Sequence, residues 1–79
     1  MGFFSSKKIF GSSLDIKQRL YKIRTLDYKE RPRVYEALIK ELDDGGVTEE
    51  EFKLVIRHLR EDNDISEIDR KNLLALLEE

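Results

Sequence analysis

Cysteine and tryptophan are absent from this sequence, and histidine and proline occur once each. The absence of cysteine excludes disulfide bonds, thiolate zinc sites and a cysteine nucleophile. His58 has no second imidazole with which to build a metal site, so we expect it to be a surface or boundary residue. The residue types that carry much of protein chemistry are missing, and neither a cofactor nor a metal ion is predicted.

Long apolar runs are absent as well. No stretch approaches the ~20 apolar residues of a membrane span, and the first lysines are not followed by the ~7–15 apolar residues of a signal-peptide core. Together with the lack of cysteine, this favours a cytoplasmic protein. Gly2 and Ser6 match the M-G-x-x-x-[ST] myristoylation pattern, but the pattern is short and Phe3 is a bulky neighbour for the acceptor glycine. Acylation is therefore not predicted.

Charged residues make up 41% of the 79 residues, and they are unevenly divided along the chain. Residues 1–33 hold nine bases and three acids, a net charge of +6, whereas residues 34–79 hold six bases and fourteen acids, a net charge of -8. The formal net charge of -2 conceals this division. We expect the two parts mainly to balance each other inside one small domain. The alternative is that the basic part faces an anionic partner.

One stretch in the second half carries the clearest local signal. Thr48 and Glu51 have the spacing of a capping box, in which each side chain accepts a hydrogen bond from the backbone N–H of the other residue. Val47 and Phe52 are placed to form a hydrophobic staple, and apolar residues then recur at i, i+3, i+4 and i+7. These features predict a helix over residues 49–62.

Three other segments combine a capping residue with an apolar stripe. The capping residues are Ser12 or Ser13 with Asp15, Asp27 with Glu30 ahead of Pro32 in the first turn, and Ser66 with Asp69. The corresponding helices are expected over residues 14–25, 31–43 and 67–78. Gly45 or Gly46 is expected to end the second of these helices through a left-handed conformation.

The sequence therefore predicts an all-α fold, a small bundle of about four short antiparallel helices with a flexible N-terminal tail. Residues 1–12 are apolar and basic without a usable period and form the tail, whereas residues 13–79 form a single domain. No strand is expected. The predicted core comprises Ile16, Leu20, Ile23, Leu38, Leu42, Phe52, Val55, Ile56, Leu59, Leu73 and Leu77. The other residues expected to face inward are Leu14, Val34, Tyr35, Ile39, Ile68 and Leu76.

The acidic turn before Glu51 resembles the second half of an EF-hand, with Gly45 at loop position 6 and Glu51 at position 12. The resemblance fails at loop positions 1 and 3, where Lys40 and Leu42 stand in place of the oxygen ligands that calcium requires. Calcium binding is therefore not expected. The last two helices are equally unsuited to reading DNA as a helix-turn-helix, because phosphate would repel the acids of the final helix.

The candidate binding residues lie in the basic part of the chain. Within the expected first helix, Lys17, Tyr21 and Arg24 fall at i, i+4 and i+7 and so share one face. A basic helix that carries a tyrosine is suited to binding phosphate or an acidic peptide. The full set of candidate partner-binding residues is Lys7, Lys8, Lys17, Arg19, Tyr21, Lys22 and Arg24.

No catalytic motif, phosphate-binding loop or concave site with paired carboxylates is recognisable, so we do not expect an enzyme. The first hypothesis is a non-catalytic protein–protein interaction module, an adaptor or regulator whose partner is another protein. The alternative is a binder of anionic surfaces, membrane or nucleic acid, through the basic N-terminal segment. Nucleic acid is disfavoured by the acidic second half. Peripheral membrane contact would use the phenylalanines and lysines of the tail.

Overall fold

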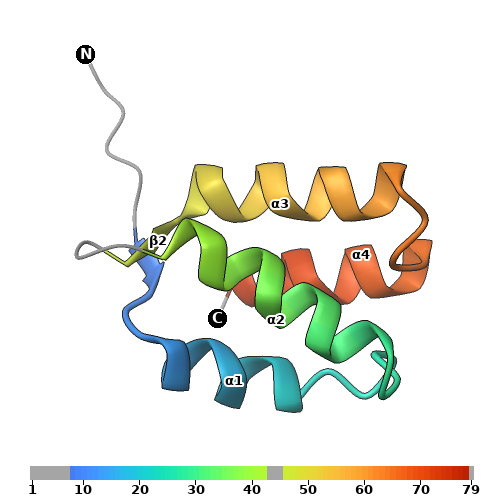
Figure 1. Ribbon diagram of the computed structural model, residues 1–79, viewed down its shortest axis with the longest axis horizontal. Helices are drawn as coiled ribbons and strands as arrows, with labels where there is room; N and C mark the ends of the chain where they lie inside the picture. Colours follow the sequence, from blue (N-terminus) through green and yellow to red (C-terminus); the bar gives the residue numbers. More distant parts are fainter. Residues whose placement is uncertain (1–7, 43–45, 79) are drawn as a thin grey trace.

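The computed structural model describes residues 8–42 and 46–78 of the chain (Figure 1). Within these residues four α-helices enclose one core, which confirms the predicted helical class. Helix α2 packs against both α1 and α3, and α4 packs against α3. The elements in chain order are β1 (Lys8–Phe10), α1 (Ser13–Tyr21), α2 (Glu30–Glu41), β2 (Val47–Thr48), α3 (Glu49–Glu61), α4 (Glu67–Leu74) and the 3-10 turn η1 (Ala75–Glu78).

The predicted capping residues form side-chain caps at the starts of α1, α3 and α4, and at α2 the predicted pair begins three residues ahead of the helix. In α3 the hydroxyl of Thr48 accepts from the N–H of Glu51 at 3.2 Å, and the carboxylate of Glu51 accepts from the N–H of Thr48 at 2.9 Å. Ser66 and Asp69 repeat this reciprocal arrangement at α4, with both distances at 3.1 Å. Asp27 and Glu30 form the same pair of bonds ahead of α2, and Ser12 caps α1 by accepting from the N–H of Asp15. These local signals were sufficient to predict where the helices begin, because each capping partner lies within three residues of the other.

The turn between α3 and α4 also has a local cause. Asn63 adopts a left-handed conformation with φ of 60°, which asparagine tolerates better than most residues. Its N–H donates to the carbonyl of Arg60 at 3.1 Å, and the N–H of Asp64 donates to the carbonyl of Leu59 at 2.9 Å. This is the pair of bonds that defines a Schellman motif, and it ends α3 at Glu61.

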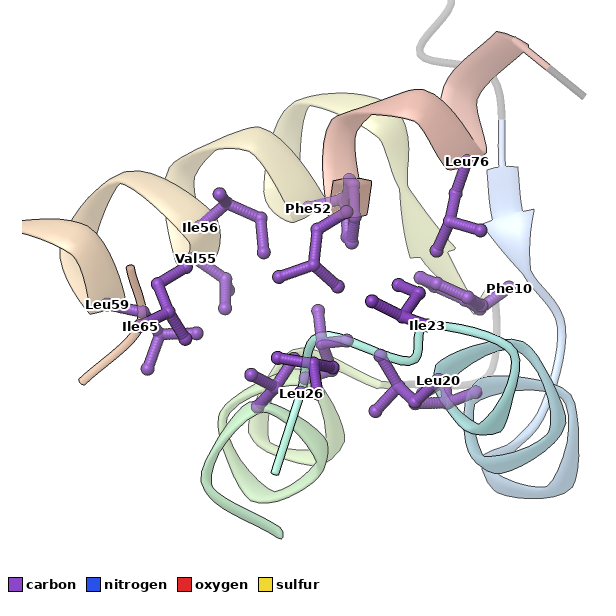
Figure 2. Close-up of a cluster of buried hydrophobic side chains, with 14 of the residues drawn as sticks. Phe10, Leu20, Ile23, Leu26, Phe52, Val55, Ile56, Leu59, Ile65 and Leu76 are labelled. Carbon is purple, nitrogen blue, oxygen red and sulfur yellow. The ribbon is translucent and has the colours of Figure 1, made fainter. Parts of the chain in front are cut away.

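Nine of the predicted core residues are buried, whereas Leu42 and Leu77 are only partly buried. Of Leu76 and Leu77, which were both expected to face inward, only Leu76 is fully buried. The chain tightens into η1 after α4, and residues three apart, such as Leu73 and Leu76, then face the same side. The expectation that Leu14 and Ile68 face inward is wrong, since each is 61% exposed. Val34 and Leu76 are buried, as their expected inward orientation predicts. The buried residues that were not expected to face inward include Phe10, Leu26 and Ile65 (Figure 2). Val47, the staple residue, is buried as well.

A short antiparallel sheet corrects the prediction that no strand is present. Strand β1 pairs with β2 through Lys8 opposite Thr48 and Phe10 opposite Val47, with a bulge between the two pairs. The predicted tail is therefore wrong for residues 8–10, which belong to the folded unit, while residues 1–7 lie outside the described part of the chain. A strand of three residues is too short for its alternation to be recognised in the sequence.

Phe10 is the residue that anchors β1. Its side chain is 1% exposed, and its ring meets the ring of Phe52 edge to face, with the centroids 5.5 Å apart and an interplanar angle of 66° (Figure 2). Edge-to-face pairs of this kind contribute about 0.5–1.5 kcal/mol beyond the burial of their area. Strand β1 thus adds an aromatic side chain to the core, next to Phe52 of α3.

Gly46 lies beside this strand pair and has a positive φ of 86°. A Cβ atom added at Gly46 would stand 2.3 Å from the carbonyl oxygen of Phe10, a separation that side chains do not reach. The predicted role of this glycine, ending the second helix, is wrong because α2 ends at Glu41 and Gly46 serves the strand pairing instead. Gly45, the other glycine considered, lies outside the described residues.

We expect Gly46→Ala to lower the free energy of unfolding by about 1–3 kcal/mol, because it forces both a strained backbone and a shift of β1. Urea denaturation measures the change. Gly11→Ala is the matched control, since a Cβ at Gly11 has no atom within 4 Å. That substitution should leave stability unchanged or raise it slightly. Equal effects of the two substitutions would contradict the close approach of β1 to Gly46.

Candidate functional site

The basic residues of the first half are largely unpaired among the described residues. One ion pair joins residues 8–33 to residues 34–78, and it links Arg33 to Asp64. Every other ion pair in the described chain lies within one of the two parts, including Arg19 with its helix neighbour Asp15 at 3.3 Å. The expectation that the two parts balance each other through direct ion pairs is therefore wrong for these residues. Their charge is instead displayed on the surface.

The predicted binding residues do not form one face. Lys17 and Tyr21 line a groove between α1 and α2, whereas Lys22 and Arg24 line a different hollow beside α4 and η1. The reason is that α1 ends at Tyr21, so the i, i+4, i+7 relation does not continue to Arg24. Helical spacing had assigned these residues to one surface only because the helix was expected to reach residue 25.

The remaining candidates that the structure describes, Arg19 and Lys8, lie elsewhere. Arg19 lies over the ring of Phe10, 5.6 Å from its centroid, while forming its ion pair with Asp15. Lys8 is exposed on β1, and Lys7 lies outside the described residues. Phe10 is buried, so it cannot contribute to the membrane contact that was considered for the tail.

The groove between α1 and α2 is the most distinctive surface feature. It has a volume of about 450 Å³, its walls are mostly apolar, and no acidic side chain is among the described residues that line it. Two of its tyrosines, Tyr21 and Tyr28, are 76% and 79% exposed. We call it the tyrosine groove, and its lining residues are Lys17, Leu20, Tyr21, Tyr28, Arg31, Pro32 and Tyr35.

Cations lie against each aromatic ring of the tyrosine groove. The Nζ atom of Lys17 is 5.7 Å from the centroid of Tyr35, and the guanidinium carbon of Arg31 is 5.5 Å from the centroid of Tyr21. Lys29 stands 5.9 Å from the centroid of its neighbour Tyr28. These distances are within the range of cation–π attraction, which holds the charges over the apolar surface.

Arg31 is tied to the backbone beside the groove by two hydrogen bonds. Its guanidinium donates to the carbonyl oxygens of Ile23 and Leu26 at 2.9 and 2.8 Å. These carbonyls belong to the connection between α1 and α2, where a continued helix would have supplied N–H donors to them. Arg31 supplies the donors instead. These two hydrogen bonds hold the Arg31 side chain in place where it lines the groove.

The sequence contains a partial signal for the groove. Tyrosines occur at positions 21, 28 and 35, a spacing of seven residues, but they fall on α1, on the connection and on α2. No single helix therefore places them together. Only the antiparallel packing of α1 against α2 does so, and Tyr28, Arg31 and Tyr35 were for that reason absent from the predicted site.

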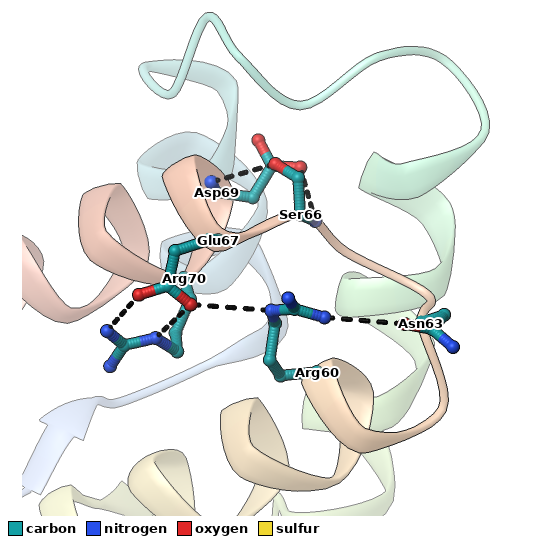
Figure 3. A network of polar contacts seen from close by, with 6 residues as sticks. All are labelled: Arg60, Asn63, Ser66, Glu67, Asp69 and Arg70. Carbon is teal, nitrogen blue, oxygen red and sulfur yellow. Dashed lines mark hydrogen bonds and ion pairs between the residues drawn. The ribbon is translucent and has the colours of Figure 1, made fainter.

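The polar network between α3 and α4 offers no comparable site. Glu67 accepts hydrogen bonds from both Arg60 and Arg70, and Arg60 also reaches Asn63 (Figure 3). The hydrogen bond from Arg70, followed by the charge of Arg70 and the contact with Arg60, lowers the pKa of Glu67 to about 2. The charged groups of this surface are thus satisfied by each other, unlike the cations of the tyrosine groove.

Three further observations bear on the chemistry of the described residues. They contain no group of three or more His, Asp or Glu side chains arranged to hold a metal ion. His58 is exposed on α3, on the side that faces α2, as expected for a surface histidine. None of the helices in this part of the chain is both long and apolar enough to cross a membrane.

Comparison with known proteins does not assign the chain to a family. No family model matches it, and neither a curated protein nor a solved structure is significantly similar to it. The functional argument therefore rests on the tyrosine groove and on the distribution of charge.

Proposed function

We propose that this protein is a non-catalytic interaction module that binds an acidic segment of a partner protein in the tyrosine groove. The observation that carries the proposal is that exposed tyrosine rings lie beside cations and that no acidic residue is among the described residues lining the groove. Tyrosine and arginine are the residue types that most often dominate the energy of protein–protein contacts. The groove therefore offers both the apolar surface and the charge that such a segment requires.

The charge of the tyrosine groove indicates that its ligand is acidic. Lys17, Lys29 and Arg31 lie over the rings, and none of the three has an ion-pair partner within the described chain. An acidic side chain of a ligand would gain a charge-assisted contact there, while the apolar side chain next to it would cover a tyrosine ring. A basic ligand would be repelled by the same cations.

The test uses a short fluorescent peptide in which glutamate alternates with leucine, and the same peptide with lysine in place of glutamate. We expect the acidic peptide alone to bind. Lys17→Glu and Tyr28→Ala should each weaken its affinity by about 5–30-fold, the usual effect of losing 1–2 kcal/mol at an interface hot spot. Both side chains are exposed, so thermal denaturation should show stability changed by no more than about 0.5 kcal/mol.

Arg24→Glu is the matched control, because Arg24 is basic and exposed but lies outside the groove. It should change binding far less than Lys17→Glu. If the two reversals weaken binding equally and Tyr28→Ala has no effect, the ligand is held by diffuse charge rather than by the groove. In that case binding to acidic liposomes or to nucleic acid, falling steeply with salt, would support the anionic-surface alternative.

A further inference from the structure

The connection between α1 and α2 carries two backbone donors that no described residue uses. The N–H of Leu26 donates to the carbonyl of Ile23 at 3.4 Å, which closes a tight turn with Arg24 and Thr25 at its centre. The backbone N–H groups of Arg24 and Thr25 donate to no described residue. Consecutive backbone N–H groups left without an acceptor in a turn are suited to binding an anion.

Hydrogen bonds from Arg31 brace this turn. The guanidinium donates to the carbonyl oxygens of Ile23 and Leu26, the residues at which the turn begins and ends, at 2.9 and 2.8 Å. Both ends of the turn are therefore tied to one side chain of α2. Donors that are held in place beforehand bind a ligand at a lower entropic cost, so the turn is suited to a specific anion site.

The turn lines a hollow of about 330 Å³ that is shared with α4 and η1. No acidic side chain is among the described residues that line it, whereas Lys22 and Arg24 are both basic and exposed. Neither of these two bases forms an ion pair with a described residue. We call this site the basic hollow, and its lining residues are Lys22, Ile23, Arg24, Thr25, Asn72 and Leu76.

Asn72 of α4 brings a further donor to the basic hollow. Its side-chain amide donates to the hydroxyl of Thr25 at 3.0 Å, which holds the amide against the turn. An amide nitrogen carries two hydrogens, and no described residue accepts from the second one of Asn72. Two segments that are 47 residues apart in the chain thus contribute donors to one site.

The number of donors favours a phosphoryl group over a carboxylate. A carboxylate offers two oxygens and one charge, whereas a phosphate monoester offers three terminal oxygens and a charge of about -1.5 to -2 at neutral pH. Two basic side chains, two backbone N–H groups and one amide N–H match the larger demand. An extended anionic surface fits less well, because residues 34–79 carry a net charge of -8 and would be repelled by it.

We propose that the basic hollow binds a phosphorylated serine side chain of a partner protein. The phosphoryl oxygens accept hydrogen bonds from the backbone N–H groups of Arg24 and Thr25, while the side chains of Lys22 and Arg24 neutralise the charge. The assignment does not depend on the tyrosine groove, because no residue lines both sites. The two sites are nevertheless neighbours, since Tyr21 lines the groove and the next residue, Lys22, lines the hollow.

The test uses a short fluorescent alanine–glycine peptide with one phosphoserine, and the same peptide with unmodified serine. Fluorescence anisotropy should show binding of the phosphorylated peptide alone. Lys22→Gln and Arg24→Gln should each weaken its affinity about tenfold, the usual effect of losing one hydrogen bond to a charged group. Both side chains are exposed, so thermal denaturation should show that the variants remain folded. Equal binding of the two peptides would overturn the proposal.

Lys40→Gln is the matched control, because Lys40 is an exposed base of α2 that lies outside the basic hollow. It removes the same charge and should change the affinity by no more than about twofold, since a distant surface charge is screened by salt. Losses of equal size for Lys40→Gln and Arg24→Gln would overturn the site. Tyr28→Ala should leave binding of the phosphorylated peptide unchanged, so a failure of the tyrosine groove and a failure of the basic hollow are distinguishable.

Two further measurements identify the donors and the source of the phosphate. In a nitrogen-15 NMR titration with inorganic phosphate, the amide protons of Arg24 and Thr25 should shift downfield and saturate. Unchanged positions of both amides would contradict their role as donors. Vesicles of phosphatidylserine and phosphatidylcholine should not bind. Vesicle binding that is lost in Arg24→Gln would assign the basic hollow to a lipid headgroup and overturn the protein partner.

Discussion

Phe10→Ala is expected to lower the free energy of unfolding by about 3–5 kcal/mol, the usual cost of removing a buried aromatic ring. Phe10 is 1% exposed and forms an edge-to-face pair with Phe52, so the substitution leaves a cavity in the middle of the core. It also removes the residue that anchors β1, so the loss should include part of the strand pairing.

Urea denaturation monitored by circular dichroism measures this loss. Ile9→Ala is the control, because Ile9 is on the same strand but only partly buried, and it should cost clearly less than Phe10→Ala. If Phe10→Ala leaves the urea midpoint unchanged, residues 8–10 are not part of the folded unit. The flexible segment through residue 12 that the sequence indicated would then be correct.

Phe52→Ala is the second large effect, with an expected loss of about 3–5 kcal/mol. Phe52 is fully buried, pairs with Phe10 and follows the capping box of α3. Thr48→Ala, which removes one capping hydrogen bond, should cost only about 1 kcal/mol. Denaturant melts that rank the two variants the other way would show that the cap, rather than the buried ring, determines the stability of this region.

The double variant of Phe10 and Phe52 separates the ring contact from simple burial. Residues in direct contact are not additive, and an edge-to-face pair accounts for about 0.5–1.5 kcal/mol of coupling. The double variant should therefore lose less stability than the sum of the two single variants. Strict additivity would mean that the two rings do not interact.

Helix α1 shows why part of the candidate site was misplaced. Its apolar stripe and its basic face both continue in the sequence to about residue 25, yet the helix ends at Tyr21. Arg31, ten residues further on, supplies hydrogen bonds to the carbonyls of Ile23 and Leu26, so the chain can leave the helix without orphaned backbone groups. No residue near the end of α1 indicates that Arg31 will supply these hydrogen bonds.

The sequence by itself determined the helical class, the four helix starts and most of the core. These features were predictable because a capping box is completed within three residues and an apolar stripe repeats within one helix. The tertiary structure alone decided the pairing of β1 with β2 and the position of the tyrosine groove. Each of those depends on residues that are distant in the chain, and their interaction energy exists only once the helices have packed.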